Sequence, residues 1–258
     1  MDQKKRRLWL IRYLMEETAE YQNINIPAGE AGQKTLLRAL MNIRPPEPIT
    51  EEFIQIQDAY LTEETLEKNI TRLEDLIPIR EHIYLWQGDI TSLKTDGIVN
   101  AGNSSLLGCF VPCHGCIDNA IHSAAGVQLR LECRRLMEQQ GHEEPAGNAR
   151  ITEAYNLPCR YILHTVGPII RGVPSVNDRR LLAACYHSCL EAAAVHQLTS
   201  LAFCCISTGE FHFPNDIAAE IAVSTTTDFI KSHTGMEVVF NVFKETDYKI
   251  YRRLLEAD

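Results

Sequence analysis

The chain has 258 residues, 45% of them hydrophobic, and a formal net charge of −9 at pH 7. A chain of this size can bury a full hydrophobic core without disulfide or metal staples. The acidic balance argues against general binding to nucleic acid, and no stretch of about 18 apolar residues is present, so we expect no membrane span. A small anionic ligand is compatible with the charge, because backbone N–H groups can bind phosphates.

Cysteine usage indicates the compartment. The chain has nine cysteines, an odd number, with clusters at 109–116 and 204–205. Chains that fold through disulfides usually spread their cysteines in a framework. The clustering therefore favours free or metal-bound thiols in a reducing compartment, and we expect a cytoplasmic protein.

Residues 1–75 are expected to form a helical N-terminal extension. Leu8, Ile11 and Leu14 recur at the spacing of one helix face. The proline-rich segment RPPEPIT at 44–50 would interrupt a helix and connect two of them. Motifs that carry chemistry are scarce here, so the sequence predicts a role in packing.

From about residue 76 onward the pattern changes to strands that alternate with helices. The predicted strands are HIYLWQGDI, GIVNAGN, ARITEAYNL, YILHTVG, SLAFCCIST and EVVFNVF. Helical patterns are CIDNAIHSAAGVQLRLECRRLMEQQ with a break at Gly126, DRRLLAACYHSCLEAAAVHQL, NDIAAEIAVSTTTDFIKSH and ETDYKIYRRLLEAD. Such alternation is typical of a layered α/β domain, which we place at residues 76–258.

Three predicted loops follow the carboxyl ends of strands: QGDI, NAGNSSLLG and STGEFHFP. In open α/β sheets the ligand site lies beyond such strand ends. All three loops combine glycine with small polar residues, as a pocket lined by backbone requires. Neither a Walker loop nor a GxGxxG fingerprint occurs, so the common nucleotide-binding motifs are absent.

The segment GCFVPCHGCIDNAIH at 108–122 gathers four soft ligands, Cys109, Cys113, His114 and Cys116, directly before a predicted helix. Zinc accepts thiolate and imidazole in tetrahedral geometry. A structural site would use all four groups, whereas a catalytic site would use three and keep one position open. A third interpretation is a redox couple, because Cys113 and Cys116 form a CxxC pair before a helix.

Several longer segments together resemble a known family. GDIT at 88–91, DGIVNAGNSSLLG at 96–108, PAGNARITEAYNLPCRYILHTVGP at 145–168 and SLAFCCISTGEFHFP look like parts of a macrodomain, the ADP-ribose-binding module. The resemblance implies a three-layer α/β/α fold with a mixed sheet. The cysteine-rich insertion and the helical extension are similar to the zinc-containing subclass, whose members are bacterial and fungal protein ADP-ribosylhydrolases.

This resemblance implies a bound Zn2+ ion. The subclass pattern Cys-x4-His-x-Cys selects Cys109, His114 and Cys116 as ligands, and Cys113 is then either a bystander or a fourth ligand. With three protein ligands, zinc would polarise a hydroxyl of the distal ribose or a water.

Two residues are expected to act at the distal ribose: Asp118 as the catalytic carboxylate and Asn103 as the group that positions the sugar. Asp89 would accept a hydrogen bond from the adenine amino group, and the loop from Ser207 to Phe211 would wrap the diphosphate with backbone N–H groups. Because Glu210 stands where the family usually has a small apolar residue, its side chain is expected to point outward. The full set of implied ADP-ribose contacts is Asp89, Ile90, Asn100, Ala101, Asn103, Ile117, Asp118, Asn119, Ser207, Thr208, Gly209, Glu210 and Phe211.

The resemblance therefore predicts a hydrolase that removes mono-ADP-ribose from modified protein side chains. The bond cleaved would join C1″ of the distal ribose to the acceptor, and an ester to an acidic side chain is the expected case. The partner would be a mono-ADP-ribosylated protein, with a lipoyl carrier protein as a candidate target by family resemblance. Two alternatives stay open: a reader that binds ADP-ribose around a structural zinc with Cys113 as fourth ligand, and a thiol redox protein.

Several other polar groups are interpreted as structural. His122 falls on the predicted helix after the cysteines and is expected to be a core or supporting histidine. His164 lies in a predicted strand, where lone histidines are mostly structural. The pair Cys204–Cys205 is interpreted as small buried hydrophobic residues, and the pair Glu143–Glu144 as a solvated turn.

Overall fold

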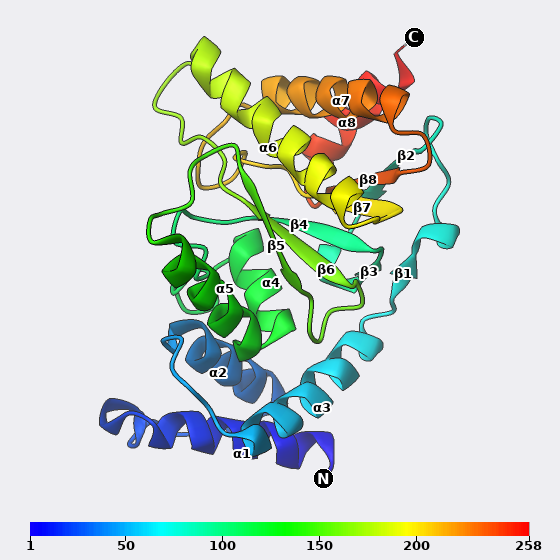
Figure 1. Cartoon of the computed structure of the whole chain (residues 1–258). Helices are drawn as coiled ribbons and strands as arrows, with labels where there is room; N and C mark the ends of the chain where they lie inside the picture. Colours follow the sequence, from blue (N-terminus) through cyan, green and yellow to red (C-terminus); the bar gives the residue numbers. More distant parts are fainter. Residues whose placement is uncertain (258) are drawn as a thin grey trace.

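A six-stranded sheet forms the middle layer of the computed structural model, which describes residues 1–257 (Figure 1). The strand order is β2-β8-β7-β4-β6-β5, and β5 runs antiparallel to β6 while the other neighbours are parallel. The strands are β2 (Ile83–Gln87), β4 (Gly97–Ala101), β5 (Ala149–Glu153), β6 (Tyr161–Thr165), β7 (Ser200–Phe203) and β8 (Glu237–Val242). A separate parallel pair consists of β1 (Thr71–Arg72) and β3 (Leu93–Lys94).

Helices cover both faces of this mixed sheet. In Figure 1, α4 and α5 lie on one face, and α6, α7 and α8 lie on the other. Their bounds are α4 (Ile117–Ala125), α5 (Val127–Gln140), α6 (Val176–Val195), α7 (Asn215–Ser232) and α8 (Glu245–Glu256). Gly126 separates α4 from α5 with a φ of 100°, so the break predicted there is confirmed. The three-layer α/β/α fold with a mixed sheet is confirmed as well.

The central strands are covered by helices on both faces, which explains why their sequences are continuous apolar runs. Every residue of β7 is buried, and β8 is buried from its second residue onward. Parallel strands in such a position read as continuous apolar runs, as SLAF and VVF do. Asn100 of β4 and His164 of β6 are polar exceptions that are paired in register and almost fully buried. Buried polar groups need hydrogen-bond partners, and theirs lie in the site described below.

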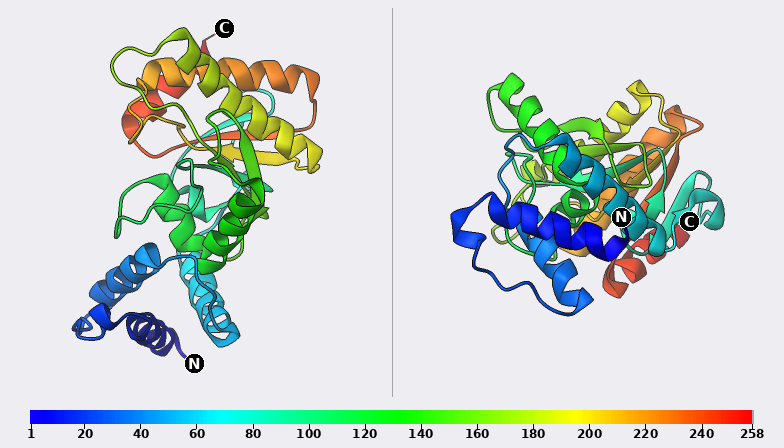
Figure 2. Two further views of the ribbon diagram at one scale, coloured as in Figure 1. Left: turned by 60° about the vertical axis from the view of Figure 1, so that its left-hand side comes forward. Right: turned by 90° about the horizontal axis from the view of Figure 1, so that it is seen from below.

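The N-terminal extension is helical, as predicted, and its helices are α1 (Gln3–Glu16), α2 (Glu30–Ile43) and α3 (Glu51–Glu67). Figure 2 shows them together at one end of the molecule, where α2 and α3 contact α4 and α1 lies farthest from the sheet. Thr50 begins α3, since its hydroxyl accepts a hydrogen bond from the Phe53 N–H at 3.3 Å. The remaining short elements are the 3-10 turns η1 (Ala19–Tyr21), η2 (Leu73–Asp75) and η3 (Ile90–Ser92).

The extension has a hydrophobic core of its own. Leu10, Ile11 and Phe53 are fully buried in this cluster, and Val127 of α5 joins it from the α/β part. The extension is therefore packed onto α5 through apolar contacts. The exact domain boundary near residue 75 stays a prediction. Within residues 1–257, no helix combines the length and the hydropathy needed to cross a membrane.

Candidate active site

A cleft of about 770 Å³ opens at the carboxyl ends of the parallel strands. The structure brings the three predicted loops together there, because residues of QGDI, NAGNSSLLG and STGEFHFP all line it. Its volume lies within the usual range of small-molecule and cofactor sites. The location follows the rule for open α/β sheets, where strand ends and the loops after them form the ligand site.

The sequence interpretation missed a fourth loop. Phe243 and Lys244 follow β8, Asp247 lies in the first turn of α8, and all three line the same cleft. Phe243 is 77% exposed, so its ring is available to a ligand. The sequence did contain a signal for this segment. EVVFNVF was predicted as a strand, and the ligand site of an open α/β sheet lies beyond the carboxyl ends of its strands.

The loop after β7 has a tight backbone conformation. Ser207 has a φ of 64°, in the left-handed region, and its carbonyl accepts a hydrogen bond from the Phe213 N–H at 2.9 Å. Gly167 lies directly against it, because a Cβ at Gly167 would come 1.9 Å from Ser207 Oγ. The Glu210 side chain is 66% exposed, and its Oε1 lies 3.6 Å from Nε2 of His114, which also lines the cleft, so its outward direction stays a prediction.

Asp89 follows β2 and lines the cleft beside Ile90. Its Oδ1 accepts hydrogen bonds from the N–H and the hydroxyl of Thr91 at 3.0 and 2.7 Å, and its Oδ2 lies 3.1 Å from Lys68 Nζ. Burial alone would raise the pKa of Asp89, but the Thr91 hydrogen bonds and the Lys68 charge hold it below its ordinary value. The cleft therefore presents an ionised acceptor at this point.

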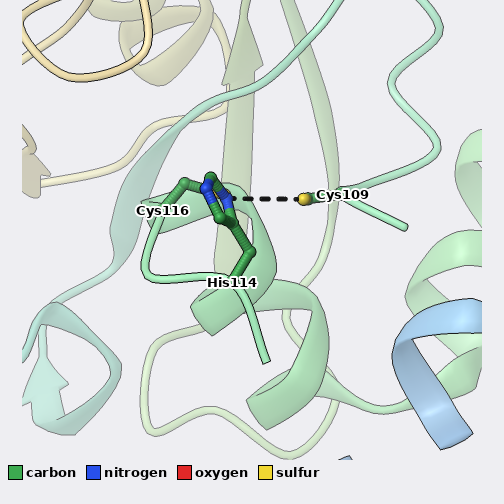
Figure 3. A group of neighbouring side chains, drawn as sticks. All are labelled: Cys109, His114 and Cys116. Atoms are coloured by element: carbon green, nitrogen blue, oxygen red, sulfur yellow. Dashed lines mark hydrogen bonds between the residues drawn. The ribbon is translucent and has the colours of Figure 1, made fainter. Parts of the chain in front are cut away.

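Cys109, His114 and Cys116 converge on one part of the cleft (Figure 3). Their ligand atoms all lie within 4.8 Å of one another, and Cys109 Sγ lies 3.7 Å from His114 Nδ1. Cys113 is not part of this cluster, because its thiol donates to the Thr35 carbonyl at 3.4 Å. Two thiols and an imidazole at this spacing fit a zinc ion, and a set of three leaves one tetrahedral position for a further ligand.

Asp118 lies in the first turn of α4, which Cys116 begins by accepting a hydrogen bond from the Asn119 N–H at 3.4 Å. The Asp118 side chain borders the cleft but is only 6% exposed. Asn100 Nδ2 donates to its Oδ1 at 2.8 Å, and Asn103 Nδ2 lies 3.5 Å from its Oδ2. Burial raises the pKa of Asp118 to about 6, although the Asn100 hydrogen bond acts in the opposite direction. A partly desolvated carboxyl group in a cleft suits a proton acceptor.

Residues 99–222 match the family model described as "Macro domain". The chain is 54% identical over 260 residues to the Protein-ADP-ribose hydrolase of Treponema medium, covering 99% of this chain and 100% of that protein. The chain belongs to the macrodomain family. A Protein-ADP-ribose hydrolase of Staphylococcus aureus (strain MSSA476) is 46% identical over 258 residues, covering 99% of this macrodomain and 97% of that protein. The Trypanosoma brucei macrodomain in complex with ADP-ribose is 30% identical with a TM-score of 0.66, covering 84% of this macrodomain and 94% of that chain.

Two of the residues predicted to contact the ligand, Asn100 and Asn119, do not line the cleft. Asn100 is 1% exposed, Asn119 is fully buried, and neither lines the cleft. Asn100 Nδ2 donates to Asp118 Oδ1 at 2.8 Å, and Asn119 Nδ2 donates to the Val111 carbonyl at 3.0 Å. Both amide nitrogens donate inside the protein and neither side chain lines the cleft, so the structure does not support direct contact with a ligand, although Asn100 Oδ1 has no hydrogen-bond partner within residues 1–257. The other predicted contacts all line the cleft: Asp89, Ile90, Ala101, Asn103, Ile117, Asp118, Ser207, Thr208, Gly209, Glu210 and Phe211.

A buried chain of hydrogen-bonded polar groups connects Asp118 to the interior of the protein. Besides its bond to Asp118, Asn100 Nδ2 lies 3.1 Å from His164 Nδ1, and His164 Nε2 lies 2.9 Å from the Thr152 hydroxyl. Since the amide nitrogen is a donor, His164 Nδ1 accepts and its Nε2–H donates to Thr152, which describes a neutral ring. Burial lowers the pKa of His164 to about 4, in agreement with that neutral state. The interpretation of His164 as a structural histidine fits this arrangement.

We expect His164 to make the macrodomain sensitive to acid. Its pKa is about 4 in the folded state and about 6.5 in the unfolded state, so its stabilising contribution is complete above pH 6.5 and is lost as the pH falls toward 4. The loss is about 1.4 kcal/mol per pH unit in this window. Urea unfolding at several pH values should show the free-energy difference between the wild type and His164→Gln shrinking as the pH falls. Parallel curves would contradict this assignment.

The remaining structural interpretations hold only in part. Glu144 is 2% exposed and accepts a hydrogen bond from Arg150 Nε at 2.9 Å, so the prediction of a solvated turn is wrong for this residue. Its N–H also donates to the Ser104 carbonyl at 2.8 Å, which ties the turn to the loop after β4. Cys204 is buried and Cys205 is half-buried, and both border the cleft because β7 ends just before them.

Proposed function

We propose that this macrodomain hydrolyses the bond between ADP-ribose and a modified protein side chain. The observation that carries the proposal is that Asp118 and the cluster of Cys109, His114 and Cys116 border the same cleft. Relatives that match nearly the whole chain, from Treponema medium and Staphylococcus aureus, are named Protein-ADP-ribose hydrolase. A buried carboxylate and a metal-type cluster beside a cleft support an enzyme in preference to a reader.

The cleft offers the groups that ADP-ribose needs. Asp89 is an ionised acceptor for the adenine amino group, and the Ile90 N–H lies next to it. The loop Ser207–Phe211 lines the cleft and would bind the diphosphate through backbone N–H groups. Binding of this kind needs no basic side chains, which suits a chain with a net charge of −9. The Trypanosoma brucei macrodomain, which is similar to this chain, has been solved in complex with ADP-ribose, and this supports ADP-ribose as the ligand.

Cys109, His114 and Cys116 would hold the zinc ion, because their donor atoms suit zinc and lie close enough to share one ion. Zinc bound there would supply Lewis acidity beside the distal ribose. The Cys113 thiol faces the Thr35 carbonyl instead of the cluster. A set of three protein ligands is typical of catalytic zinc sites, whereas structural sites use four.

Asp118 is proposed to accept a proton during hydrolysis. Asn100 donates to its Oδ1, so Oδ2, which lies 3.5 Å from Asn103 Nδ2, is the oxygen proposed to take the proton. Asn103 would orient the sugar, and its amide is itself held by the Gly108 carbonyl at 3.2 Å. Water supplies the hydroxyl group that C1″ retains and the proton that the acceptor gains, so the products are free ADP-ribose and an unmodified acid. Such a proton acceptor contributes about 10²–10⁴-fold to the rate.

The substrate is proposed to be a mono-ADP-ribosylated protein with an ester to an acidic side chain. A lipoyl carrier protein is a candidate target by family resemblance. None of the nine cysteines, all within residues 1–257, forms a disulfide, which fits a reducing compartment, and we therefore place the reaction in the cytoplasm.

The proposal is tested with a carrier protein that is mono-ADP-ribosylated on glutamate. We expect the protein to release ADP-ribose, to stop after treatment with a zinc chelator, and to recover when zinc is added back. Chromatography of the released nucleotide measures the reaction. Binding of ADP-ribose without any release would make the protein a reader, and release that survives complete zinc removal would exclude a catalytic metal.

A further inference from the structure

We infer that helix α2 of the N-terminal extension holds the metal-binding loop in its active conformation, with Arg38 as the positioning residue. The loop is Cys109–Cys116, which carries the three proposed ligands. The catalytic meaning of this inference rests on the proposed function, whereas the contacts themselves are independent of it. The extension would then contribute to the site and not only to packing.

The loop has little hydrogen bonding of its own. In the part of the chain that the structure describes, one backbone–backbone hydrogen bond joins two loop residues, from the His114 N–H to the Val111 carbonyl at 3.2 Å. Phe110 and Val111 are 40% and 55% exposed, so the outer part of the loop is not held by burial either. A segment with few internal contacts samples many conformations unless other elements restrain it. Its ligands therefore need support from outside the loop.

Arg38 of α2 provides this support at two points. Its Nη2 donates to the His114 carbonyl at 3.1 Å and to Asn119 Oδ1 at 2.7 Å, and its Nε donates to the same Asn119 oxygen at 3.2 Å. Asn119 then donates from Nδ2 to the Val111 carbonyl at 3.0 Å. One guanidinium group thus connects the backbone of a proposed ligand, the first turn of α4 and the outer part of the loop. Lysine cannot replace it, because a single ammonium lacks the planar set of donors.

Two further residues of α2 contact Cys113, the cysteine outside the cluster. Asn42 Oδ1 accepts a hydrogen bond from the Cys113 N–H at 2.9 Å, and the Thr35 carbonyl accepts one from its thiol at 3.4 Å. Cys113 has a φ of 54°, a left-handed conformation that a residue other than glycine keeps only when its surroundings impose it. Because His114 follows directly, this turn sets the direction from which the imidazole approaches the cluster.

Helix α2, which supports the loop, is in turn held by Arg130 of the α/β part. Arg130 of α5 donates from Nη1 to three carbonyl groups at the C-terminal end of α2, at 3.2, 2.8 and 2.6 Å, those of Met41, Asn42 and Arg44. Its Nε donates to the Leu107 carbonyl at 2.7 Å, just before the loop. A cation is favourable at a helix C-terminus, where carbonyl groups lack partners. Arg130 therefore holds α2 and the start of the loop in one fixed arrangement.

The test compares Arg38→Ala with Arg12→Ala, which removes an exposed arginine from α1 of the same extension. In Arg38→Ala, amide hydrogen exchange in Cys109–Asn119 should become at least about 10-fold faster, and zinc loss to a chelator should accelerate about 10-fold or more. The kcat for ADP-ribose release should fall, while KM and ADP-ribose affinity change little. Arg38→Lys should not restore zinc retention, and Arg12→Ala should behave as the wild type.

Wild-type exchange, zinc retention and kcat in Arg38→Ala would overturn the inference. If the wild type releases no ADP-ribose, the proposed function fails, but the exchange and zinc measurements still decide whether α2 supports the loop. If Arg38→Ala does not fold, Asn42→Ala provides the same test, because it removes the acceptor of the Cys113 N–H. Unchanged loop exchange in folded Asn42→Ala would then contradict the inference.

Discussion

Replacing Cys116 with serine is expected to lower the release of ADP-ribose by at least ~100-fold while leaving ADP-ribose binding nearly unchanged. The thiol is one of three proposed zinc ligands, and a metal centre supplies several kcal/mol of transition-state stabilisation. The fold should be retained, because Cys116 is also the residue that begins α4 and serine is a good residue at that position. Release of ADP-ribose, zinc content and ADP-ribose affinity by calorimetry give the three measurements.

Cys113→Ser is the matched control. It removes a thiol three positions away that contacts the Thr35 carbonyl and does not belong to the cluster. We expect it to keep its zinc and most of its activity, since a serine hydroxyl can donate to the same carbonyl. Equal losses of zinc in both variants would make Cys113 a fourth ligand and the zinc structural, and full activity in Cys116→Ser would remove the metal from the reaction.

The fold could be predicted from sequence because its elements have strong local signals. The central strands are apolar runs, as in SLAF and VVF, and their burial on both faces explains this. Gly126 marked the break between two helices, and its φ of 100° shows why glycine is required. The cleft could be predicted for a similar reason, because parallel strands bring their carboxyl ends and the loops after them to one edge.

The direction of individual side chains could not be predicted in the same way. Asn100 and Asn119 stand in motifs that point to a ligand, yet both side chains are buried and hold other residues in place. Which way a side chain turns depends on partners from distant segments, such as His164 for Asn100 and Arg38 for Asn119. Local sequence carries no signal for such pairs, since they are 64 and 81 positions apart.

The role of the extension was hidden for the same reason. Its sequence shows amphipathic helices and no chemical motif, so packing was the natural interpretation. Only the folded arrangement places Arg38 beside His114 and the cleft. The proposed zinc ligands and proton acceptor thus come from one short segment, Cys109–Asp118, while the groups that orient them come from α2, β4 and α5. We therefore expect substitutions in the supporting residues to alter turnover more than ligand affinity.

Asp118→Asn is expected to lower the release of ADP-ribose by about 10²–10⁴-fold, the usual contribution of a general base. The change removes the charge and keeps the shape, and Asn100 Nδ2 can still donate to the remaining amide oxygen. The fold and the cleft should therefore persist, and ADP-ribose should bind with an affinity close to that of the wild type. Single-turnover release from a glutamate-linked carrier measures the chemical step separately from product release.

Asp216→Asn is the control. Asp216 lies in the first turn of α7, as Asp118 does in α4, but Asp216 is exposed and lies outside the cleft whereas Asp118 is buried beside it. Removing a favourable charge from a helix N-terminus should affect both helices similarly, so a loss of activity confined to Asp118→Asn assigns the effect to the site. If Asp118→Asn keeps its turnover, the proton acceptor lies elsewhere. If it loses ADP-ribose affinity in proportion to turnover, Asp118 contributes to binding and not to the chemical step.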